Sequence, residues 1–396
     1  MAWKPSKSFA IAAGLEVAAC ALFLYEERHF AALGYSSHPL AFTLQCAIVS
    51  AALLLLAARP RSSSLWVFAI VTAAYAIAMM FSIKWFPLNY LRSDMLPVIA
   101  QADQRVLQHG NPYAPLYLGT RQYDFPYLPG MIVAYLPISA LRLDLRIGEL
   151  LYTLATAALV FWATCRDRRA DVAGLLAVFL LSPFLQFRHD LYIQPHWMTM
   201  IFTFVLMQRR RFAWAALVFG TSMAIYQFSW ILLPFLLLNG LRRRGWPEVA
   251  RLALLSTLGA LMIAGPFLQE ATHRIAINTV SQWSQLPHAV ADAMNLSYWA
   301  TYILRPGDLL PLQAMLMVAI FSFCLLRGRC ADLPDTLRWM STALIVFVLF
   351  NVVVDGYFFL MILIVLLAYI CAANGWWEDT EVHCSPTTAT SAPAMS

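Results

Sequence analysis

The stretch "LWVFAIVTAAYAIAMMFSIKWF", residues 65–86, decides the fold class. It carries one charged residue, Lys84, and is as long as the roughly 20 apolar residues that a transmembrane helix needs. The whole chain has the same character, since 61% of its 396 residues are hydrophobic and only 12% are charged. Soluble domains carry about 25% charged residues, so a soluble core is excluded. We predict an all-α polytopic membrane protein, because backbone groups in lipid must be satisfied within each span.

Twelve apolar segments of helical length follow one another along the chain, with ends that we expect to be accurate to about four residues. Several are shorter than a vertical span requires, so we expect those helices to tilt little or to extend into polar sequence. The predicted spans are 9–25, 40–58, 65–83, 147–164, 172–187, 196–208, 212–226, 228–240, 249–268, 309–326, 339–353 and 356–373.

Arginine clusters predict the orientation, because cytoplasmic loops carry an excess of Lys and Arg. The clusters are Arg59 with Arg61, Arg166 with Arg168 and Arg169, Arg209 to Arg211, Arg242 to Arg244, and Arg327 with Arg329. All of them fall on the cytoplasmic face if "PGMIVAYLPISAL" (129–141) does not cross, so we interpret that proline-broken segment as a re-entrant or interfacial helix. The arginines supply most of the net charge of +6 and serve as topology determinants or as contacts with anionic lipid headgroups.

This topology predicts the domain organisation. Residues 1–64 hold two N-terminal membrane helices, 65–373 the main membrane domain, and 374–396 a low-complexity tail that we expect to be disordered and cytoplasmic. The outer face carries the loops 84–146 and 269–308 and the short turn 188–195, and an interfacial helix is expected from Thr272 to Trp283. We expect a bacterial plasma membrane protein whose chemistry lies on the outer face, away from ATP and nucleotide sugars.

The first outer loop opens with a short amphipathic helix. Ser93 can cap it, Pro97 is tolerated in its first turn, and apolar residues recur at helical spacing up to Gly110, where a left-handed C-cap is expected. Such a helix lies in the membrane interface. Asp94 sits in its first turn and is either a capping carboxylate, worth about 0.3–1 kcal/mol, or a functional group.

Aromatic side chains gather after this helix, in "HGNPY" (109–113) and "YDFPYLPG" (123–130). Aromatic residues near the headgroup level often form only an interfacial belt. Here they accompany an acidic residue, an arginine and rigid proline turns. We therefore interpret the loop as a cleft for a polar ligand that is attached to a lipid.

The aspartate of "SDM" (93–95), the "GNPY" (110–113) and the "FPYLPG" (125–130) together resemble the GT-C superfamily of membrane glycosyltransferases. They are most similar to its polyprenol-phosphate-mannose-dependent α-mannosyltransferase family, in which the last element reads Tyr-Pro-Pro rather than Pro-Tyr-Leu-Pro. Residues 209–244 also resemble that family's helical pair between basic clusters. Tyr226 and Gln227 stand there in the place of the family's frequent lysine.

The resemblance implies a GT-C-like fold and a hexosyltransferase that inverts the anomeric carbon. A mannose-like sugar would pass from a polyprenyl phosphate to a lipid-linked or cell-envelope glycan acceptor, with membrane lipids as further partners and no nucleic acid. Asp94 would be the general base, a role that typically contributes about 10²–10⁴-fold. The sugar-phosphate lipid is a co-substrate, and no metal or other cofactor is implied.

Further polar residues are candidates for the same site. Asp190 is the alternative base, in "FRHDLYIQPHW" (187–197), and a metal held by His189 and His196 is not expected because Pro195 interrupts the helix and a third ligand is lacking. None of the seven cysteines falls in an outer loop, so no disulfide framework is expected there. The candidate phosphate and sugar contacts are Arg92, Arg105, Tyr113, Arg121, Tyr127, Arg188, His189, Gln194 and His288.

Three other classes of protein stay open at this stage. A secondary transporter or flippase for an envelope lipid or solute fits the span count, although internal repeats are not evident and Glu16 is the clearest charge inside a span. A polymerase or ligase of lipid-linked glycans has a dominant late loop, whereas the densest pattern here is early. In an assembly protein without catalysis, Asp94 would be only a helix cap.

Overall fold

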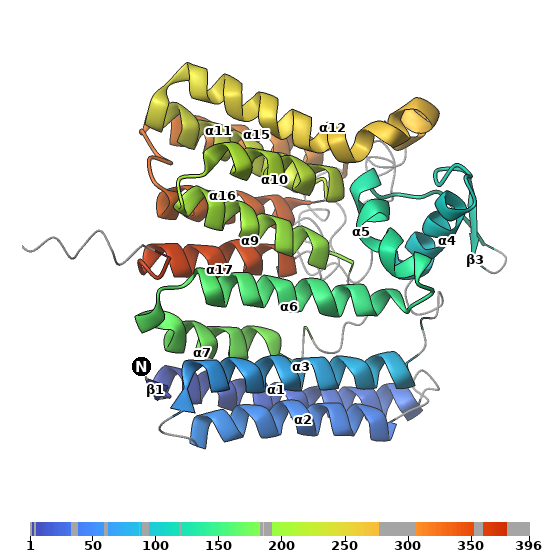
Figure 1. Ribbon diagram of the computed structural model, residues 1–396, viewed down its shortest axis with the longest axis vertical. Helices are drawn as coiled ribbons and strands as arrows, with labels where there is room; N and C mark the ends of the chain where they lie inside the picture. The colour runs from blue at the N-terminus through green and yellow to red at the C-terminus, as the bar shows by residue number, and fades with distance from the viewer. Residues whose placement is uncertain are drawn as a thin grey trace, which may run out of the picture.

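The computed structural model describes residues 2–3, 5–32, 39–58, 62–86, 88, 95–118, 121–182, 185, 192–276, 306–351 and 359–377. Helices make up nearly all of this part of the chain and lie roughly side by side in one bundle (Figure 1). The helices are α1 (Lys7–Ala32), α2 (Pro39–Ala58), α3 (Ser64–Trp85), α4 (Met95–Leu107), α5 (Pro129–Ala140), α6 (Leu145–Ala163), α7 (Arg169–Leu180), α9 (Gln194–Gln208), α10 (Phe212–Ile225), α11 (Ser229–Arg244), α12 (Trp246–Ala276), α15 (Pro306–Leu326), α16 (Leu333–Phe350) and α17 (Phe359–Ala373).

Two small antiparallel strand pairs accompany the helices. The pair β1 (Ala2–Trp3) and β2 (Ser62–Ser63) ties the N-terminus to the turn before α3, and β3 (Leu116–Leu118) pairs with β4 (Arg121–Tyr123) in the loop after α4. In the second pair Leu116 lies opposite Tyr123. Neither pair was predicted, because two or three residues are too few to show an alternating pattern.

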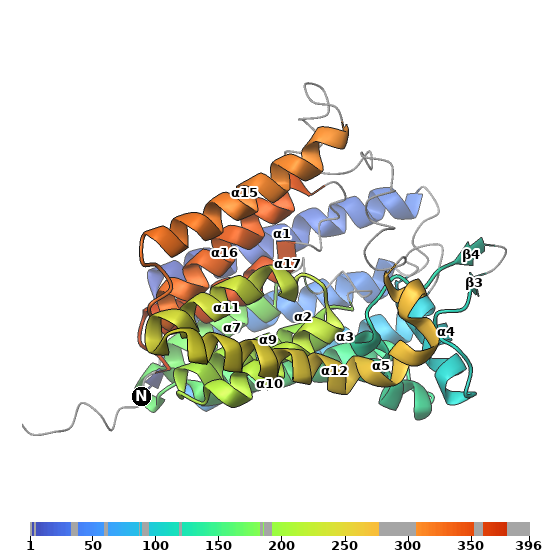
Figure 2. The same cartoon turned by 90° about the horizontal axis from the view of Figure 1, so that it is seen from above.

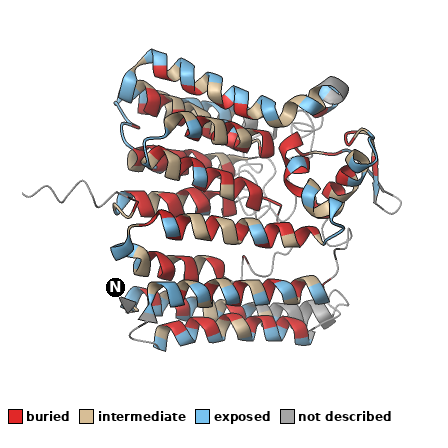
Figure 3. Ribbon diagram, in the orientation of Figure 1, coloured by how far each residue is buried: buried red, intermediate tan, exposed pale blue. Residues whose placement is uncertain are grey.

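Each of the twelve predicted spans overlaps a helix of the structure. Five of the described helices are long and apolar enough to cross a bilayer: residues Leu40–Ala58, Ser64–Trp85, Leu145–Ala163, Trp246–Leu268 and Leu333–Phe350. Large apolar side chains are exposed on the outer helices, among them Leu15, Trp66, Leu254 and Met262, and Figure 3 shows the buried residues concentrated between the helices. These features indicate an all-α membrane protein, whereas the number of twelve crossings stays a prediction.

The helix α12 differs from its prediction. It is continuous for 31 residues and contains Pro266, so it runs past the predicted end at 268 as far as Ala276. Thr272 therefore lies in the last turns of α12 and does not begin a separate helix; residues 277–283 lie outside the described part. In Figure 1 this end of α12 reaches beyond α10 toward α5.

The basic turns share one end of the bundle. Arg209 Nη2 lies 3.4 Å from the carbonyl oxygen of Ala163, Arg242 donates to the carbonyl of Leu325, and Cys165 N donates to Trp376 O at 2.8 Å. Figure 1 shows these turns on the same side as the N-terminus, with α4, α5 and β3 at the opposite end. This is the arrangement that the predicted topology requires, and the compartment that each end faces stays a prediction.

Glycines allow α10 and α12 to pack backbone against backbone (Figure 2). A Cβ added to Gly220 would lie 2.0 Å from the carbonyl oxygen of Ser256, and one added to Gly259 would lie 2.1 Å from that of Leu217. Close approach through small residues is how helices associate in membranes, where lipid removes the hydrophobic driving force between them. The contact holds α12 along the whole of α10 and carries its far end toward the first outer loop.

Candidate functional site

A buried arginine fixes the point where the chain leaves α3. The Arg146 guanidinium is 2% exposed and pairs with Asp144, whose carboxylate also caps the start of α6. It donates to three carbonyl oxygens at the end of α3, those of Ser82, Ile83 and Phe86. A cation is stabilised at a helix C-terminus because the last carbonyls have no partner within the helix. Arg146 thus fixes the C-terminal end of α3 against the start of α6.

The predicted amphipathic helix is present as α4, with Leu96, Ile99 and Ala102 on its buried face, and its place in the membrane interface stays a prediction. The prediction for its end was wrong by one residue. His109 takes the left-handed conformation (φ 59°), and Gly110 N donates to Arg105 O at 2.7 Å, which is a Schellman motif with His109 at the C′ position. Histidine tolerates this conformation better than most side chains, so Gly110 is not the left-handed residue.

Side chains of α4 hold the following loop in place. Arg105 donates to the carbonyls of Ala114 and Pro115, and the Gln101 amide bonds to both backbone groups of Tyr117, at 2.5 and 3.1 Å. Asn111 Oδ1 accepts from Tyr113 N at 2.8 Å and so shapes the "GNPY" turn. Both terminal nitrogens of the Arg105 guanidinium therefore donate to the backbone of this loop. The contact of Arg105 with a phosphate stays a prediction.

The two predicted motif elements lie against each other. Tyr113 Oη donates to the carbonyl oxygen of Tyr127 at 2.9 Å, and the Phe125 ring packs edge-on against both tyrosine rings. All three side chains are buried. Tyr113 and Tyr127 thus form a wall of the site in this structure, and their predicted contact with sugar stays a prediction.

The aromatic wall continues into the helical bundle. Ring contacts with centroid separations of 4.5 to 6.0 Å join distant parts of the sequence in a chain: Tyr127 with Tyr192, Tyr192 with Tyr226, Tyr226 with its near neighbour Phe228, and Phe228 with Phe347. Aromatic pairs in such offset geometries contribute about 0.5–1.5 kcal/mol each beyond the area they bury. The first outer loop is therefore attached to the ends of α10, α11 and α16.

The glycine of "FPYLPG" permits a close backbone contact. A Cβ on Gly130 would lie 2.6 Å from the carbonyl carbon and oxygen of Ala224, so the start of α5 rests directly on the last turn of α10. The helices α9, α10 and α11 have only 15, 14 and 16 residues, which is about 21 to 24 Å of length. They begin or end in the basic turns, so their other ends lie toward α5, which packs on α10.

A buried polar cluster lies where α10 ends and where α9 and α11 begin. His196 Nδ1 is 2.8 Å from Ser222 Oγ and 3.2 Å from Ser229 Oγ, and the two serine oxygens are 3.1 Å apart. Gln194, a predicted substrate contact, is the first residue of α9; it is 2% exposed, and its Oε1 has no hydrogen-bond partner among the described residues. Sequence reasoning missed the two serines, because only the packing of α9 against α10 and α11 brings them to His196.

A second buried group lies between α4 and α5. Asp103 is fully buried, and its Oδ2 accepts from Ser139 Oγ at 2.5 Å. Burial raises the pKa of Asp103 to about 7, and the Ser139 hydrogen bond lowers it by less. The sequence placed Asp103 beside the apolar face of α4, and only the position of α5 shows that it is enclosed.

A polar pocket adjoins the "GNPY" turn. It has a volume of about 320 Å³ and is lined by His109, Asn111 and Tyr113 on one side and by Pro266 and Phe267 of α12 on the other. Arg274 Nη1, from the end of α12, donates to Tyr113 O at 3.2 Å and places an exposed cation beside this turn. The long α12 therefore supplies the second wall of the candidate site.

Several predicted residues are not placed by the structure. Arg121 begins β4 opposite Leu118, and only its backbone is described. Within the described ranges there is no group of three His, Cys, Asp or Glu side chains that could hold a metal. The predicted residues that lie outside the described part are Asp94, Arg92, Asp190, Arg188, His189 and His288.

Comparisons with protein-family models, with characterised proteins and with solved structures find no match for this chain.

Proposed function

We propose that the chain is a membrane glycosyltransferase that moves a mannose-like sugar from a polyprenyl phosphate to a lipid-linked or cell-envelope glycan acceptor. The observation that carries the proposal is the hydrogen bond between Tyr113 and Tyr127. It joins the two sequence motifs into one wall beside a polar pocket, at the end of the bundle opposite the basic turns. A lipid-borne sugar phosphate would present its head at this level of the membrane.

In the proposed step, an acceptor hydroxyl oxygen forms a bond to the anomeric carbon from the face opposite the phosphate. The bond between that carbon and the phosphate oxygen breaks, and its electron pair leaves with the polyprenyl phosphate. The acceptor proton passes to the carboxylate of Asp94, which directly precedes α4 in the chain. The anionic leaving group needs a cationic partner, and Arg274 is the described arginine beside the pocket.

The test compares two aspartates of the same loop in membranes supplied with a radiolabelled polyprenyl-phosphate sugar. Asp94→Asn should lower transfer by about 10²–10⁴-fold at normal expression, because it removes the base. Asp124→Asn is the matched control, since Asp124 is exposed in the same loop. Unchanged transfer by Asp94→Asn would reject its role as base, and no transfer by the wild type from any such donor would reject the enzyme.

One observation favours the alternative of a transporter. His196, Ser222 and Ser229 form a buried polar cluster where α10 ends and α11 begins, and polar groups at interrupted helices are typical of transport sites. Solute uptake by sealed vesicles that depends on an ion gradient and is lost in His196→Ala would support this alternative. Such uptake, together with the absence of sugar transfer by the wild type, would decide for transport.

A further inference from the structure

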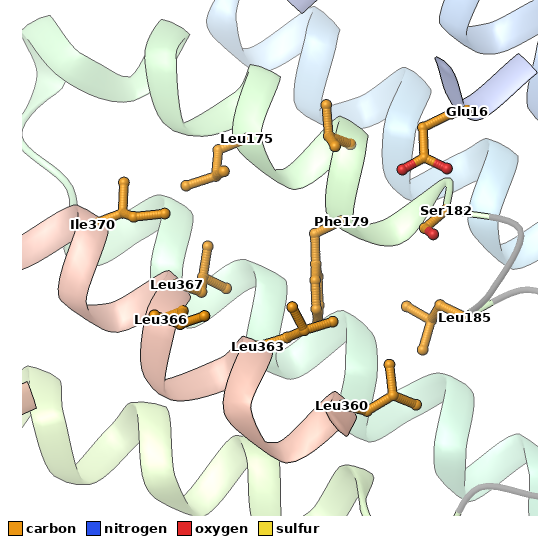
Figure 4. A pocket seen from close by; sticks show the side chains of 11 residues that line it. Glu16, Leu175, Phe179, Ser182, Leu185, Leu360, Leu363, Leu366, Leu367 and Ile370 are labelled. Carbon is orange, nitrogen blue, oxygen red and sulfur yellow. The ribbon is translucent and has the colours of Figure 1, made fainter. Parts of the chain in front are cut away.

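A second pocket lies between α1, α7 and α17 (Figure 4), and its lining shares no residue with the aromatic wall. Its volume is about 260 Å³. The helix α1 packs along α2 and touches α7, whereas α17 packs on α16 and α9. The pocket occupies the space that α1 and α17 leave between them above α7.

The lining of this pocket is divided into a long apolar part and a short polar part. Glu16 is the single charged side chain that lines it, and Ser182 is the other polar one. Figure 4 shows the Glu16 carboxylate and the Ser182 hydroxyl next to each other at one end, away from Leu366 and Ile370. The remaining lining is leucine, isoleucine, valine and phenylalanine.

The shape of the apolar part suits a chain that lies along a helix. Leu360, Leu363, Leu367 and Ile370 of α17 line it in succession, and the distance from the first to the last along the axis is about 15 Å. Phe179 of α7 covers the middle. A single alkyl chain would replace lipid or water against these side chains.

The polar end of the pocket, formed by Glu16 and Ser182, determines which headgroup a ligand must carry. A carboxylate within an apolar membrane segment is costly unless a cation neutralises it. A protonated primary amine has three N–H donors, which suits the two acceptors at this end, the Glu16 carboxylate and the Ser182 hydroxyl. A quaternary ammonium has the charge but no donor, and an alcohol has a donor but no charge.

We propose that this pocket binds a single-chain primary alkylammonium amphiphile, with the ammonium between Glu16 and Ser182 and the chain along α17. This site is separate from the aromatic wall and the "GNPY" pocket, so it does not depend on the proposed glycosyl transfer.

The test measures binding to the purified full chain in lipid nanodiscs, with dodecylammonium, dodecyltrimethylammonium and dodecanol as probes. The wild type should bind dodecylammonium at least about tenfold more tightly than dodecanol, because a charge-assisted hydrogen bond adds to the chain contacts. Dodecyltrimethylammonium should fall between them. Glu16→Gln should abolish the preference for the amine and leave the binding of dodecanol unchanged.

Two further variants test whether the probes bind in this pocket or elsewhere on the protein. Leu363→Trp fills the pocket and should weaken all three probes, whereas Leu15→Trp changes an exposed position on α1 that does not line it and should weaken none. Equal binding of amine and alcohol by the wild type would overturn the proposal. So would an unchanged preference in Glu16→Gln, or tight amine binding by Leu363→Trp.

Discussion

The hydroxyl oxygen of Tyr113 lies 2.9 Å from the carbonyl oxygen of Tyr127, and both residues are buried against Phe125. This hydrogen bond closes the loop between the two aromatic elements. Without it, a buried carbonyl would lose a donor, and Tyr127 would lose its fixed position beside Tyr192.

Tyr113→Phe tests this contact. We expect the free energy of unfolding to fall by about 1–3 kcal/mol, because the Tyr127 carbonyl loses a buried donor while the ring remains. Tyr117→Phe is the control, since Tyr117 is exposed in the same loop. The measurement is the unfolding transition in detergent, and equal stability of the two variants would show that the hydrogen bond contributes nothing.

Gly130→Ala tests the contact between α5 and α10. The new Cβ would lie 2.6 Å from the Ala224 carbonyl, so one helix must move, and overpacking of this kind costs about 1–3 kcal/mol. Gly14→Ala on α1 has no atom within 4 Å of its added Cβ and should not lower stability. A thermal shift assay on both variants is sufficient; a Gly130→Ala protein as stable as the wild type would contradict the close packing.

The raised pKa of Asp103 predicts a pH dependence of stability. The folded state keeps this proton up to pH about 7, whereas the unfolded chain loses it near the ordinary value of 3.8. Stability is therefore highest below pH about 4, falls as the pH rises toward 7, and is constant with respect to this group above that. Asp103→Asn should remove the decline between pH 5 and 7.

The control for this measurement is Asp124→Asn, which changes an exposed aspartate and should keep the decline. Unfolding temperatures at pH 5, 6, 7 and 8 distinguish the two variants. A wild type whose stability does not change over this range would contradict the burial of Asp103 between α4 and α5.

Arg146→Met should be the most destabilising of these substitutions. It leaves Asp144 without its cation and removes the guanidinium donor from three carbonyls at the end of α3, of which that of Ser82 still accepts from Phe86 N. Breaking a buried ion pair costs about 3–5 kcal/mol. Arg142→Met, at an exposed position before α6, should have little effect. Denaturant titration or yield of folded protein measures the difference, and a small effect of Arg146→Met would show that α3 ends independently of this clamp.

The sequence predicted the helices well, because their signal is local. The apolar segments and the helical spacing of Met95, Ile99 and Ala102 locate the observed helices, although several ends lie more than four residues from their predicted positions, as at Ala32 of α1 and Leu333 of α16. The end of α12 was missed because Pro266 and the polar residues after it resemble a helix boundary, whereas the helix tolerates them. The residues that the structure brings together at the candidate site could not be predicted in this way. Contacts such as that of Gly130 with Ala224 depend on the arrangement of whole helices.

The shortness of α9, α10 and α11 has a consequence for the surrounding bilayer. A hydrocarbon layer is about 30 Å thick, so helices of about 21 to 24 Å that start at one surface stop short of the other by several ångströms. At the end of α10 protein takes up the difference, because Gly130 at the start of α5 packs against Ala224. For the proposed lipid-borne donor, this arrangement would bring backbone groups of α5 to a depth that hydrocarbon otherwise occupies, which would lower the cost of taking its polar head out of water.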